Sequence, residues 1–503
     1  MTISVPQSVP LYTAAQTREL DRLAIEQAGI TGYALMTRAG EACWEMLLSC
    51  WPAARSVTVL CGAGNNGGDG YVIARLALAA GRQVRLLQLG DCERLPGEAQ
   101  QARADFVAAG GTVVPFDPAC ALTGEVIIDA LLGTGVDRPL EGLWCEAVVA
   151  MNAATAAVLA VDIPSGLHAD SGAILGVAVE AQHTVTFIGR NTGLYTGAAA
   201  DCVGQLHFSD LGIPESIYAG LTPAARLHGR PALGPLATPR RRSAHKGAYG
   251  HVLVIGGEQG MSGAVRLAGE AALRCGAGRV SVATRPAHAA LITAACPELM
   301  CHGIDDATQL DELLATVTVV LIGPGLGRSD WAEALLATVL ATTQPCVIDA
   351  DALNCLAARP RPPRELQVLT PHPGEAARLL GQTSAHIQHD RFGAARAIQR
   401  QYGGTVVLKG AGTVTEAGEA GTAVCAAGNP GMATPGSGDV LSGVIAALIA
   451  QGLAPAAAAE TGVCVHACAG DLAAAQGERG LLARDLIASL RTVMNRSESA
   501  HAV

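Results

Sequence analysis

Short apolar segments alternate with longer segments of helical period along most of the chain. The apolar segments have the length of single strands, and apolar residues recur at helical spacing between them, which predicts alternating strands and helices. Chains with this alternation form α/β folds whose parallel strands are buried on both faces. The predicted strands are Val57–Cys61, Val84–Leu89, Val126–Asp129 and Val158–Asp162 in the first half, and His251–Gly256, Val280–Thr284, Val317–Ile322, Cys346–Asp349 and Val406–Leu408 in the second. Before them, Thr13–Cys50 is expected to form two helices with a break at Gln27–Gly32.

Glycine-rich loops follow the predicted strands. Gly62–Gly70 lies between the strand that ends at Cys61 and a predicted helix over Tyr71–Ala80. A strand, a glycine loop and a helix in this order are typical of a nucleotide-binding site. The spacing differs from the Gly-x-Gly-x-x-Gly dinucleotide motif, so the distinctive part of the loop is Asn65–Asp69.

A second glycine turn precedes the most apolar helix of the chain. Gly436, Ser437 and Gly438 form a turn of small residues, and Asp439 opens a segment with apolar residues at helical spacing. Such a helix start offers unpaired N–H groups and a positive dipole end to an anion, above all a phosphate. Asp439 is then placed to take a proton from a hydroxyl that attacks a phosphoryl group. The alternative is a turn whose aspartate only caps the helix.

Two strands of the first half end on an aspartate, at Asp129 and Asp162. Because the carboxyl ends of parallel strands share one edge, Asn66 and Ser165 are expected beside these two carboxylates. A site that offers only oxygen ligands suits a hard cation. The alternative is that each aspartate caps the helix that follows it.

Composition and charge exclude several classes of partner. Of the 503 residues 16% are charged and 3% aromatic, and the net charge is −10, with Arg240–Arg242 as the one basic run. A nucleic-acid partner is therefore not expected. Fifteen cysteines occur singly, without a disulfide-like framework, and Met1–Pro10 has no secretory pattern, so we expect a cytoplasmic protein.

Two further segments could suggest a membrane or a metal. Val440–Ala459 is free of charges, but glycine, glutamine and proline interrupt it, so a buried helix and turn is expected rather than a membrane span. Cys464, His466 and Cys468 are not spaced to converge on zinc from a helix.

The motifs of the first half together resemble the NAD(P)H-hydrate epimerase family over about Tyr12–Tyr218. The resemblance implies a three-layer α/β/α, Rossmann-like fold that interconverts the R and S hydrates of NADH and NADPH. It implies a potassium ion held by Asn66, Asp129 and Ser165. Asp129 and Asp162 are the candidate proton-transfer groups, and the sequence does not choose between them. The residues implied to contact the hydrate are Asn65, Asn66, Gly67, Gly68, Asp69, Gly133, Thr134, Gly135, Val136, Asp137, Arg138, Pro139 and Asp162.

The second half resembles the ADP- or ATP-dependent NAD(P)H-hydrate dehydratases of the ribokinase-like superfamily, over about Arg240–Leu490. The resemblance rests on Asn429–Thr434 followed by the glycine turn and Asp439, with Pro435 as a departure from the expected glycine. It implies a second three-layer α/β/α domain that uses Mg²⁺ and ADP as co-substrate. The implied nucleotide-binding residues are Lys409, Gly410, Ala411, Gly412, Thr413 and Gly438, and the implied hydrate-binding residues are Ala264, Gly325, His372 and Asp439.

Three residues at the predicted strand ends of the second half keep open roles. Asp349 and Asp351 are either linked to magnesium or structural. His372 is either a satisfied loop histidine or a hydrate contact, and its Thr-Pro-His-Pro-Gly-Glu setting favours the contact.

The sequence therefore predicts a bifunctional enzyme with an epimerase domain over 1–222, a linker over 223–242 and a dehydratase domain over 243–503. NADHX and NADPHX, the hydrates, are its expected substrates. ADP is the expected phosphoryl donor, giving AMP and phosphate, and we expect a homo-oligomer. The alternatives are a small-molecule kinase acting on a hydroxymethyl-pyrimidine or sugar, and a first half that is a regulatory binding module.

Overall fold

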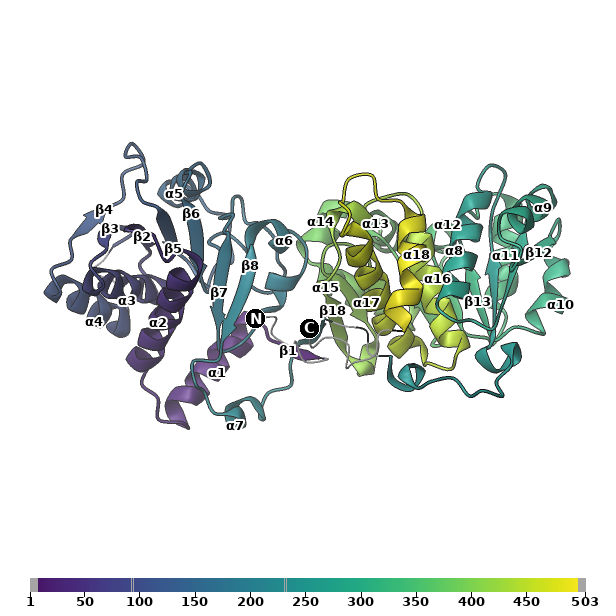
Figure 1. Ribbon diagram of the computed structural model, residues 1–503, viewed down its shortest axis with the longest axis horizontal. Helices are drawn as coiled ribbons and strands as arrows, with labels where there is room; N and C mark the ends of the chain where they lie inside the picture. The colour runs from purple at the N-terminus through teal and green to yellow at the C-terminus, as the bar shows by residue number, and fades with distance from the viewer. Residues whose placement is uncertain (1–7, 92, 94, 230, 232, 496–503) are drawn as a thin grey trace. The chain divides into compact units, whose positions relative to one another are not determined.

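The computed structural model of the chain describes residues 8–495 apart from 92, 94, 230 and 232. These residues form two compact units, one of Pro10–Ala225 and the other of 226–495 with Val9 (Figure 1). We expected no secretory pattern in Met1–Pro10, but most of this segment, residues 1–7, lies outside the described residues.

The first unit is built on a seven-stranded parallel sheet in the order β4-β3-β2-β5-β6-β7-β8. The order reverses between β2 and β5, which is where open α/β sheets bind ligands. The strands are β2 (Ser56–Cys61), β3 (Gln83–Gln88), β4 (Val113–Pro115), β5 (Val126–Ala130), β6 (Ala157–Val161), β7 (His183–Phe187) and β8 (Gln205–Ser209). The main helices are α1 (Ala14–Glu26), α2 (Gly32–Cys50), α3 (Asn65–Ala79), α4 (Gly97–Ala108) and α5 (Leu143–Asn152).

Both faces of this sheet are buried, because successive strand residues point to opposite sides. Val59 belongs to the core under α2, α3 and α4, whereas its neighbour Leu60 belongs to the core under α5. On β5, Ile128 likewise belongs to the core under α2, α3 and α4, and Ile127 to the core under α5. The first unit is therefore three-layered, as predicted, and the predicted break between α1 and α2 is confirmed.

The second unit is built on strands β10 to β18 of an eleven-stranded sheet, whose order is β1-β9-β18-β17-β16-β15-β14-β13-β10-β11-β12. Its strands from β10 to β16 are parallel, and the order reverses between β10 and β13. The strands are β1 (Val9–Leu11), β9 (Ala225–His228), β10 (His251–Ile255), β11 (Arg279–Thr284), β12 (Met300–Gly303), β13 (Val319–Ile322), β14 (Cys346–Ile348), β15 (Gln367–Leu369), β16 (Thr405–Leu408), β17 (Thr413–Glu416) and β18 (Thr422–Cys425).

Four helices bury one face of that sheet: α8 (Ser262–Arg274), α16 (Ser437–Ala450), α17 (Pro455–Ala474) and α18 (Ala483–Met494). The other helices of eight or more residues are α9 (Pro286–Ala295), α11 (Asp330–Leu340), α12 (Ala350–Ala358), α13 (Pro373–Leu380) and α15 (Arg391–Tyr402). The uncharged Val440–Ala459 segment is the buried end of α16, a turn and the start of α17, as predicted. No helix of the described residues is long and apolar enough to cross a membrane.

Part of the segment expected to link the domains is ordered structure. Ala225–His228 forms β9, which pairs in parallel with β18 and so extends the second sheet. Alternation of buried and half-buried residues along β9 explains why a strand forms there despite the prolines around it.

The contact between α8 and α16 depends on Gly443. A Cβ at this position would lie 2.2 Å from the backbone oxygen of Ala268, which cannot move without displacing α8. We predict that Gly443→Ala lowers the free energy of unfolding by about 1–3 kcal/mol. The matched control is Gly263→Ala on α8, where an added Cβ meets nothing within 4 Å. Equal thermal stabilities of the two variants would contradict this packing.

Candidate active sites

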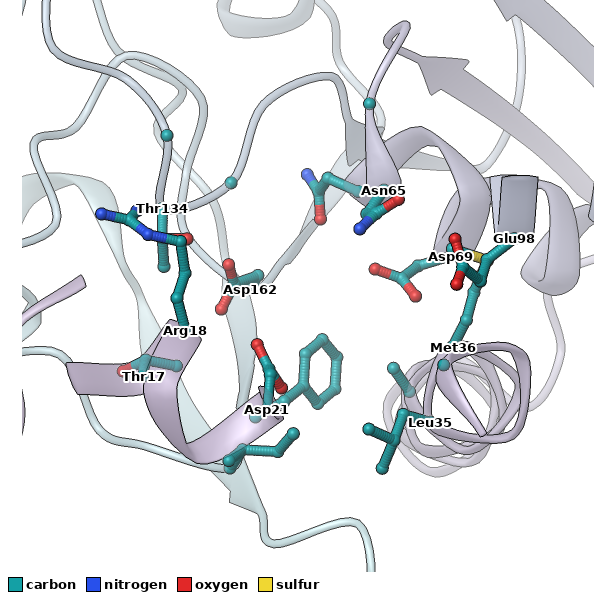
Figure 2. Close-up of a pocket in the computed structure, with 18 of the residues that line it drawn as sticks. Thr17, Arg18, Asp21, Leu35, Met36, Asn65, Asp69, Glu98, Thr134 and Asp162 are labelled. Carbon is teal, nitrogen blue, oxygen red and sulfur yellow. The ribbon is translucent and has the colours of Figure 1, made fainter. Parts of the chain in front are cut away.

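A cavity of about 460 Å³ lies at the carboxyl edge of the first sheet, where the strand order reverses (Figure 2). Its walls come from α1, α2, α3 and the loops after β5, β6, β7 and β8. The lining residues are Thr17, Arg18, Asp21, Ile25, Gly32, Leu35, Met36, Ala39, Gly64, Asn65, Asn66, Asp69, Glu98, Leu131, Leu132, Gly133, Thr134, Gly135, Val136, Asp162, Phe187, Ile188 and Leu211.

Three residues that follow strands and line this cavity share a left-handed backbone conformation. Asp162, Ile188 and Leu211 follow β6, β7 and β8 and have φ values of 68°, 61° and 54°. Residues with a Cβ rarely adopt this left-handed conformation, and they persist in it where the surrounding structure holds them. Two of them are held by the next strand, since the amide of Asp162 donates to Val185 and that of Ile188 to Ser209. All three side chains line the cavity.

Three carboxylates from three elements point into the same space (Figure 2). Burial is the largest cause that raises their pKa values, and their mutual repulsion adds to it. The pKa of Asp21 is raised to about 7, and that of Asp162 to about 6. The pKa of Asp69 is raised well above its usual range by burial and by Asp162 and Asp21. Carboxyl groups in this pH range can both give and take a proton near neutral pH.

Asp129 belongs to a buried oxygen cluster and does not line the cavity. Its carboxylate accepts hydrogen bonds from the Ser165 hydroxyl at 2.6 Å and the Ser165 amide at 2.8 Å. Burial raises its pKa to about 6, against the opposing effect of these bonds. Asn66, by contrast, is 9% exposed, and neither Oδ1 nor Nδ2 has a hydrogen-bond partner among the described residues. An unpaired buried amide oxygen fits a missing cation or polar ligand.

The structure gathers part of the predicted hydrate-binding set. The residues that line the cavity are Asn65, Asn66, Asp69, Gly133, Thr134, Gly135, Val136 and Asp162, and those that do not are Gly67, Gly68, Asp137, Arg138 and Pro139. Gly67 is needed for packing, because a Cβ there would lie 2.1 Å from the Gly62 carbonyl oxygen.

The contribution of α1 to the cavity wall was not predicted from the sequence. Thr17, Arg18 and Asp21 line the cavity from this helix, yet they belong to no motif. Their spacing of three and four residues, which places them on one helix face, was the available indication.

The second candidate site surrounds the N-terminus of α16. Gly436 caps this helix with a left-handed φ of 88°, which only glycine adopts without strain. The amides of Gly438 and Asp439 lie in the first turn and have no carbonyl of their own helix to bond. The predicted turn of small residues is therefore a helix start open to an anion.

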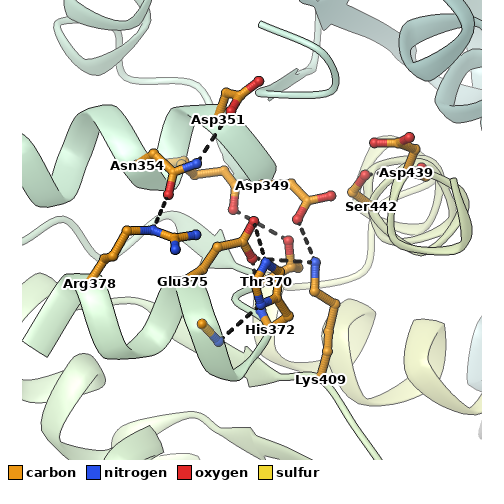
Figure 3. Close-up of polar contacts among 12 residues, drawn as sticks. Asp349, Asp351, Asn354, Thr370, His372, Glu375, Arg378, Lys409, Asp439 and Ser442 are labelled. Carbon is orange, nitrogen blue, oxygen red and sulfur yellow. Dashed lines mark hydrogen bonds and ion pairs between the residues drawn. The ribbon is translucent and has the colours of Figure 1, made fainter. Parts of the chain in front are cut away.

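The charges beside Asp439 are arranged around Lys409 (Figure 3). Lys409 Nζ lies 2.8 Å from Asp349 Oδ1 and 3.8 Å from Glu375 Oε2. Burial alone would lower the pKa of Lys409, but these two acids outweigh it and the pKa is raised, so the ammonium stays charged. Burial, with the charge of Asp349, raises the pKa of Asp439 to about 7, and Lys409 opposes the shift.

His372 is fixed at the start of α13 by hydrogen bonds with Glu375 and Gly374. The His372 amide donates to Glu375 Oε2 at 2.8 Å, and His372 Nδ1 accepts from the Gly374 amide at 3.0 Å. Burial lowers the pKa of His372, with Lys409 and Arg378 adding to the effect, so the imidazole is neutral near pH 7. Its side chain is half exposed, and Nε2 lies 3.4 Å from Glu375 Oε1.

Asp349 and Asp351, whose roles the sequence left undecided, are both bonded to other residues of the protein. Asp349 is paired with Lys409, whereas Asp351 accepts the Gly327 amide at 3.0 Å and a bond from Asn354. No group of three or more His, Cys, Asp or Glu side chains is arranged to hold a metal within the described part of the chain.

The remaining predicted residues lie in the first turns of α8 and α16, in the loops after β13 and β16, and at the start of β17. Ala264 and Gly325 are adjacent, since a Cβ on Gly325 would lie 3.2 Å from that of Ala264. Gly438 is next to Lys409, whose Nζ would be 3.2 Å from a Cβ on this glycine. The loop from Lys409 to Thr413 rests on Arg391, a fully buried side chain that the sequence analysis missed and that donates to the Leu408 and Lys409 carbonyls.

Two family models match this chain. The one described as NAD(P)H-hydrate dehydratase matches residues 252–492, and the one described as YjeF-related protein N-terminus matches residues 32–193.

Relatives match nearly the whole chain. The bifunctional NAD(P)H-hydrate repair enzyme Nnr of Coxiella burnetii is 50% identical over 96% of this chain and 99% of its own length. That of Escherichia coli is 45% identical over 98% of this chain and 95% of its own. A solved ADP/ATP-dependent NAD(P)H-hydrate dehydratase from Bacillus subtilis, co-crystallised with ATP and Mg²⁺, is 31% identical with a TM-score of 0.47, covering 52% of this chain and 94% of that one.

The raised pKa of Asp439 has a consequence for stability. Its folded pKa of about 7 exceeds the usual 3.8, so the carboxyl destabilises the fold increasingly as the pH rises between these values. Asp439→Asn carries no charge, and we expect it to be more stable than the wild type by on the order of 1–3 kcal/mol at pH 8. Near pH 4 the advantage should vanish. Thermal unfolding of both proteins at the two pH values measures this, and a pH-independent difference would contradict the assignment.

Proposed function

Because the chain belongs to the bifunctional NAD(P)H-hydrate repair enzymes, we propose that each of its two units performs one of the two reactions. The protein epimerises and dehydrates NAD(P)H-hydrate. The match of the dehydratase family model to 252–492, inside the second unit, supports the assignment of dehydration to that unit and of epimerisation to the first. No observation favours the small-molecule kinase considered as an alternative.

Epimerisation takes place in the first-unit cavity. Asp162 is the base that accepts a proton from the hydrate, because it lines the cavity and its pKa of about 6 leaves it ionised at pH 7. Asp129 is buried behind the cavity wall with Ser165, so it holds the loops after β5 and β6 together rather than touching the hydrate.

Asn66, Asp129 and Ser165 are the residues that hold a potassium ion. Their oxygen atoms are the donors that this hard cation prefers, and the unpaired Oδ1 of Asn66 supports its presence. Bound there, the ion supplies positive charge close to the carboxylates of the cavity. Ser165 fixes the cluster by donating to Asp129.

Dehydration takes place at the N-terminus of α16. Asp439 accepts the proton of the hydrate's hydroxyl while that oxygen forms a bond to the terminal phosphorus of ADP. The bond from this phosphorus to its bridging oxygen breaks, which leaves AMP and a phosphate ester of the hydrate. The amides of the first turn and Lys409 stabilise the charge on the phosphate oxygens. The electron pair of the ring nitrogen then expels phosphate from the ester, and the neighbouring ring carbon loses a proton to that phosphate, which gives NAD(P)H.

The nucleotide rests on the loop from Lys409 to Thr413 together with Gly438, and the hydrate on Ala264, Gly325 and His372. Asp351 is the residue that would help to hold a magnesium ion bound with the phosphates, and such an ion would offset the phosphate charge. The choice of ADP as donor, a homo-oligomeric state and a cytoplasmic location stay predictions.

Asp439→Ala should slow dehydration by roughly a hundred- to ten-thousand-fold, because the reaction loses its general base. Epimerisation by the same protein is the internal control and should be unchanged. Recovery of reduced-nicotinamide absorbance from mixed hydrates with ADP measures the first rate, and chromatography of the epimers without ADP measures the second. Near-native dehydration by the variant would contradict the role of Asp439 as the general base.

Ser165→Ala should weaken the response of epimerisation to potassium, since it removes one oxygen ligand and the donor to Asp129. Titration of the wild type and the variant with KCl at constant ionic strength compares the half-saturating concentrations. Identical titration curves, or a wild type that ignores potassium, would remove the ion from this site.

A further inference from the structure

We propose that Asp21 is a second catalytic residue of the epimerase, which donates a proton to the hydrate while Asp162 accepts one. The inference rests on the proposed location of epimerisation in the first-unit cavity. No motif of the epimerase resemblance includes Asp21, which lies on α1 before the first strand of the sheet.

The position of Asp21 supports a role in contact with substrate. Its carboxylate points into the cavity beside those of Asp162 and Asp69 (Figure 2). It has no ion pair or hydrogen bond within the part of the chain that the structure describes, so no structural partner explains its burial. In the same cavity Asn66 is buried with both amide atoms unpaired, which is independent evidence that a polar ligand completes the site.

Several charged and titratable groups face Asp21. Asp162 raises its pKa, and Asp21 in turn raises those of Asp69 and Tyr218. Arg18, one helical turn away, and Glu98 line the same cavity. The pKa of Asp21, about 7, lies above that of Asp162, about 6, so near pH 7 the first is half protonated and the second is mostly ionised. Two carboxyl groups whose pKa values differ in this way are suited to act as acid and base.

Asp162 and Asp21 together can invert the configuration at the hydroxyl-bearing ring carbon of the hydrate. Inversion needs one bond to the hydroxyl-bearing ring carbon to break, and we assign the bond to the ring nitrogen. Asp162 takes the hydroxyl proton, the oxygen's electron pair forms a carbonyl, and the carbon–nitrogen bond breaks with its electrons moving to nitrogen. Asp21 delivers its proton to that nitrogen.

The opened form then returns through the same groups. Rotation of the carbonyl group presents its other face, and nitrogen attacks that face. Its proton goes back to Asp21, while the oxygen regains the proton held by Asp162. No oxidant, metal-bound species or added water is required. Asp69 lines the same cavity, and its pKa is raised well above its usual range by burial and by Asp162 and Asp21.

The test compares four full-length proteins: the wild type, Asp21→Asn, Asp162→Asn and Glu19→Gln. Glu19 is the matched control, because it lies on the same helix and pairs with Arg22 on the exposed side. Epimerisation of purified S hydrate is followed by chromatography in the absence of ADP, so that dehydration does not consume it. Dehydration with ADP, thermal unfolding and the affinity for NADPH, an unreactive probe, are measured on the same samples.

We expect Asp21→Asn to slow epimerisation by roughly a hundred-fold or more, with dehydration and NADPH affinity unchanged and thermal stability not lowered. The wild-type rate should fall both below about pH 6 and above about pH 7, and residual activity of Asp21→Asn should lack the fall at high pH. Glu19→Gln should match the wild type.

Three outcomes overturn the proposal and separate it from the proposed function. Near-native epimerisation by Asp21→Asn while Asp162→Asn is inactive removes Asp21 alone from the chemistry. Near-native epimerisation by both variants removes the reaction from this cavity. A loss of epimerisation that accompanies lower thermal stability or weaker NADPH binding makes Asp21 a structural residue.

Discussion

The constraint on which both sites depend is the desolvation of carboxylates at the carboxyl edge of a parallel sheet. In each unit the loops that leave neighbouring strands meet at one edge, where the strand order reverses. The strands themselves are apolar and buried on both faces, so the acids at their ends lie beside the hydrophobic core. Aspartates placed there keep their protons to higher pH than usual, and this makes Asp162 and Asp439 suited to proton transfer near neutral pH.

The two units manage this buried charge differently. In the second unit Lys409 lies between Asp349 and Glu375, so one cation offsets the two acids closest to Asp439. In the first unit four acids, Asp21, Asp69, Glu98 and Asp162, line the cavity together with Arg18. The potassium ion proposed at Asn66, Asp129 and Ser165 would offset part of this negative charge.

Much of this arrangement was predictable from the sequence, because parallel strands, glycine loops and strand-end acids leave local patterns. Asp129, Asp162 and Asp439 follow strands or open helices, and strand–loop–helix order alone places them at the sheet edges. The rest depends on tertiary packing. Asp21 and Arg391 come from helices without motifs, and only the folded chain brings them to the sites. The strand β9 was missed because prolines around it resemble a linker, whereas its pairing with β18 supplies the stabilisation.

The central claim for the repair reaction is that Asp439 and the bare amides of α16 meet at the phosphoryl group that is transferred. A crystal structure of the full chain with ADP and Mg²⁺ tests it most directly. The account predicts the terminal phosphate oxygens at about 3 Å from the Gly438 and Asp439 amides, with the Asp439 carboxylate facing phosphorus. A terminal phosphate bound at another loop, with Asp439 turned away from it, would contradict the account.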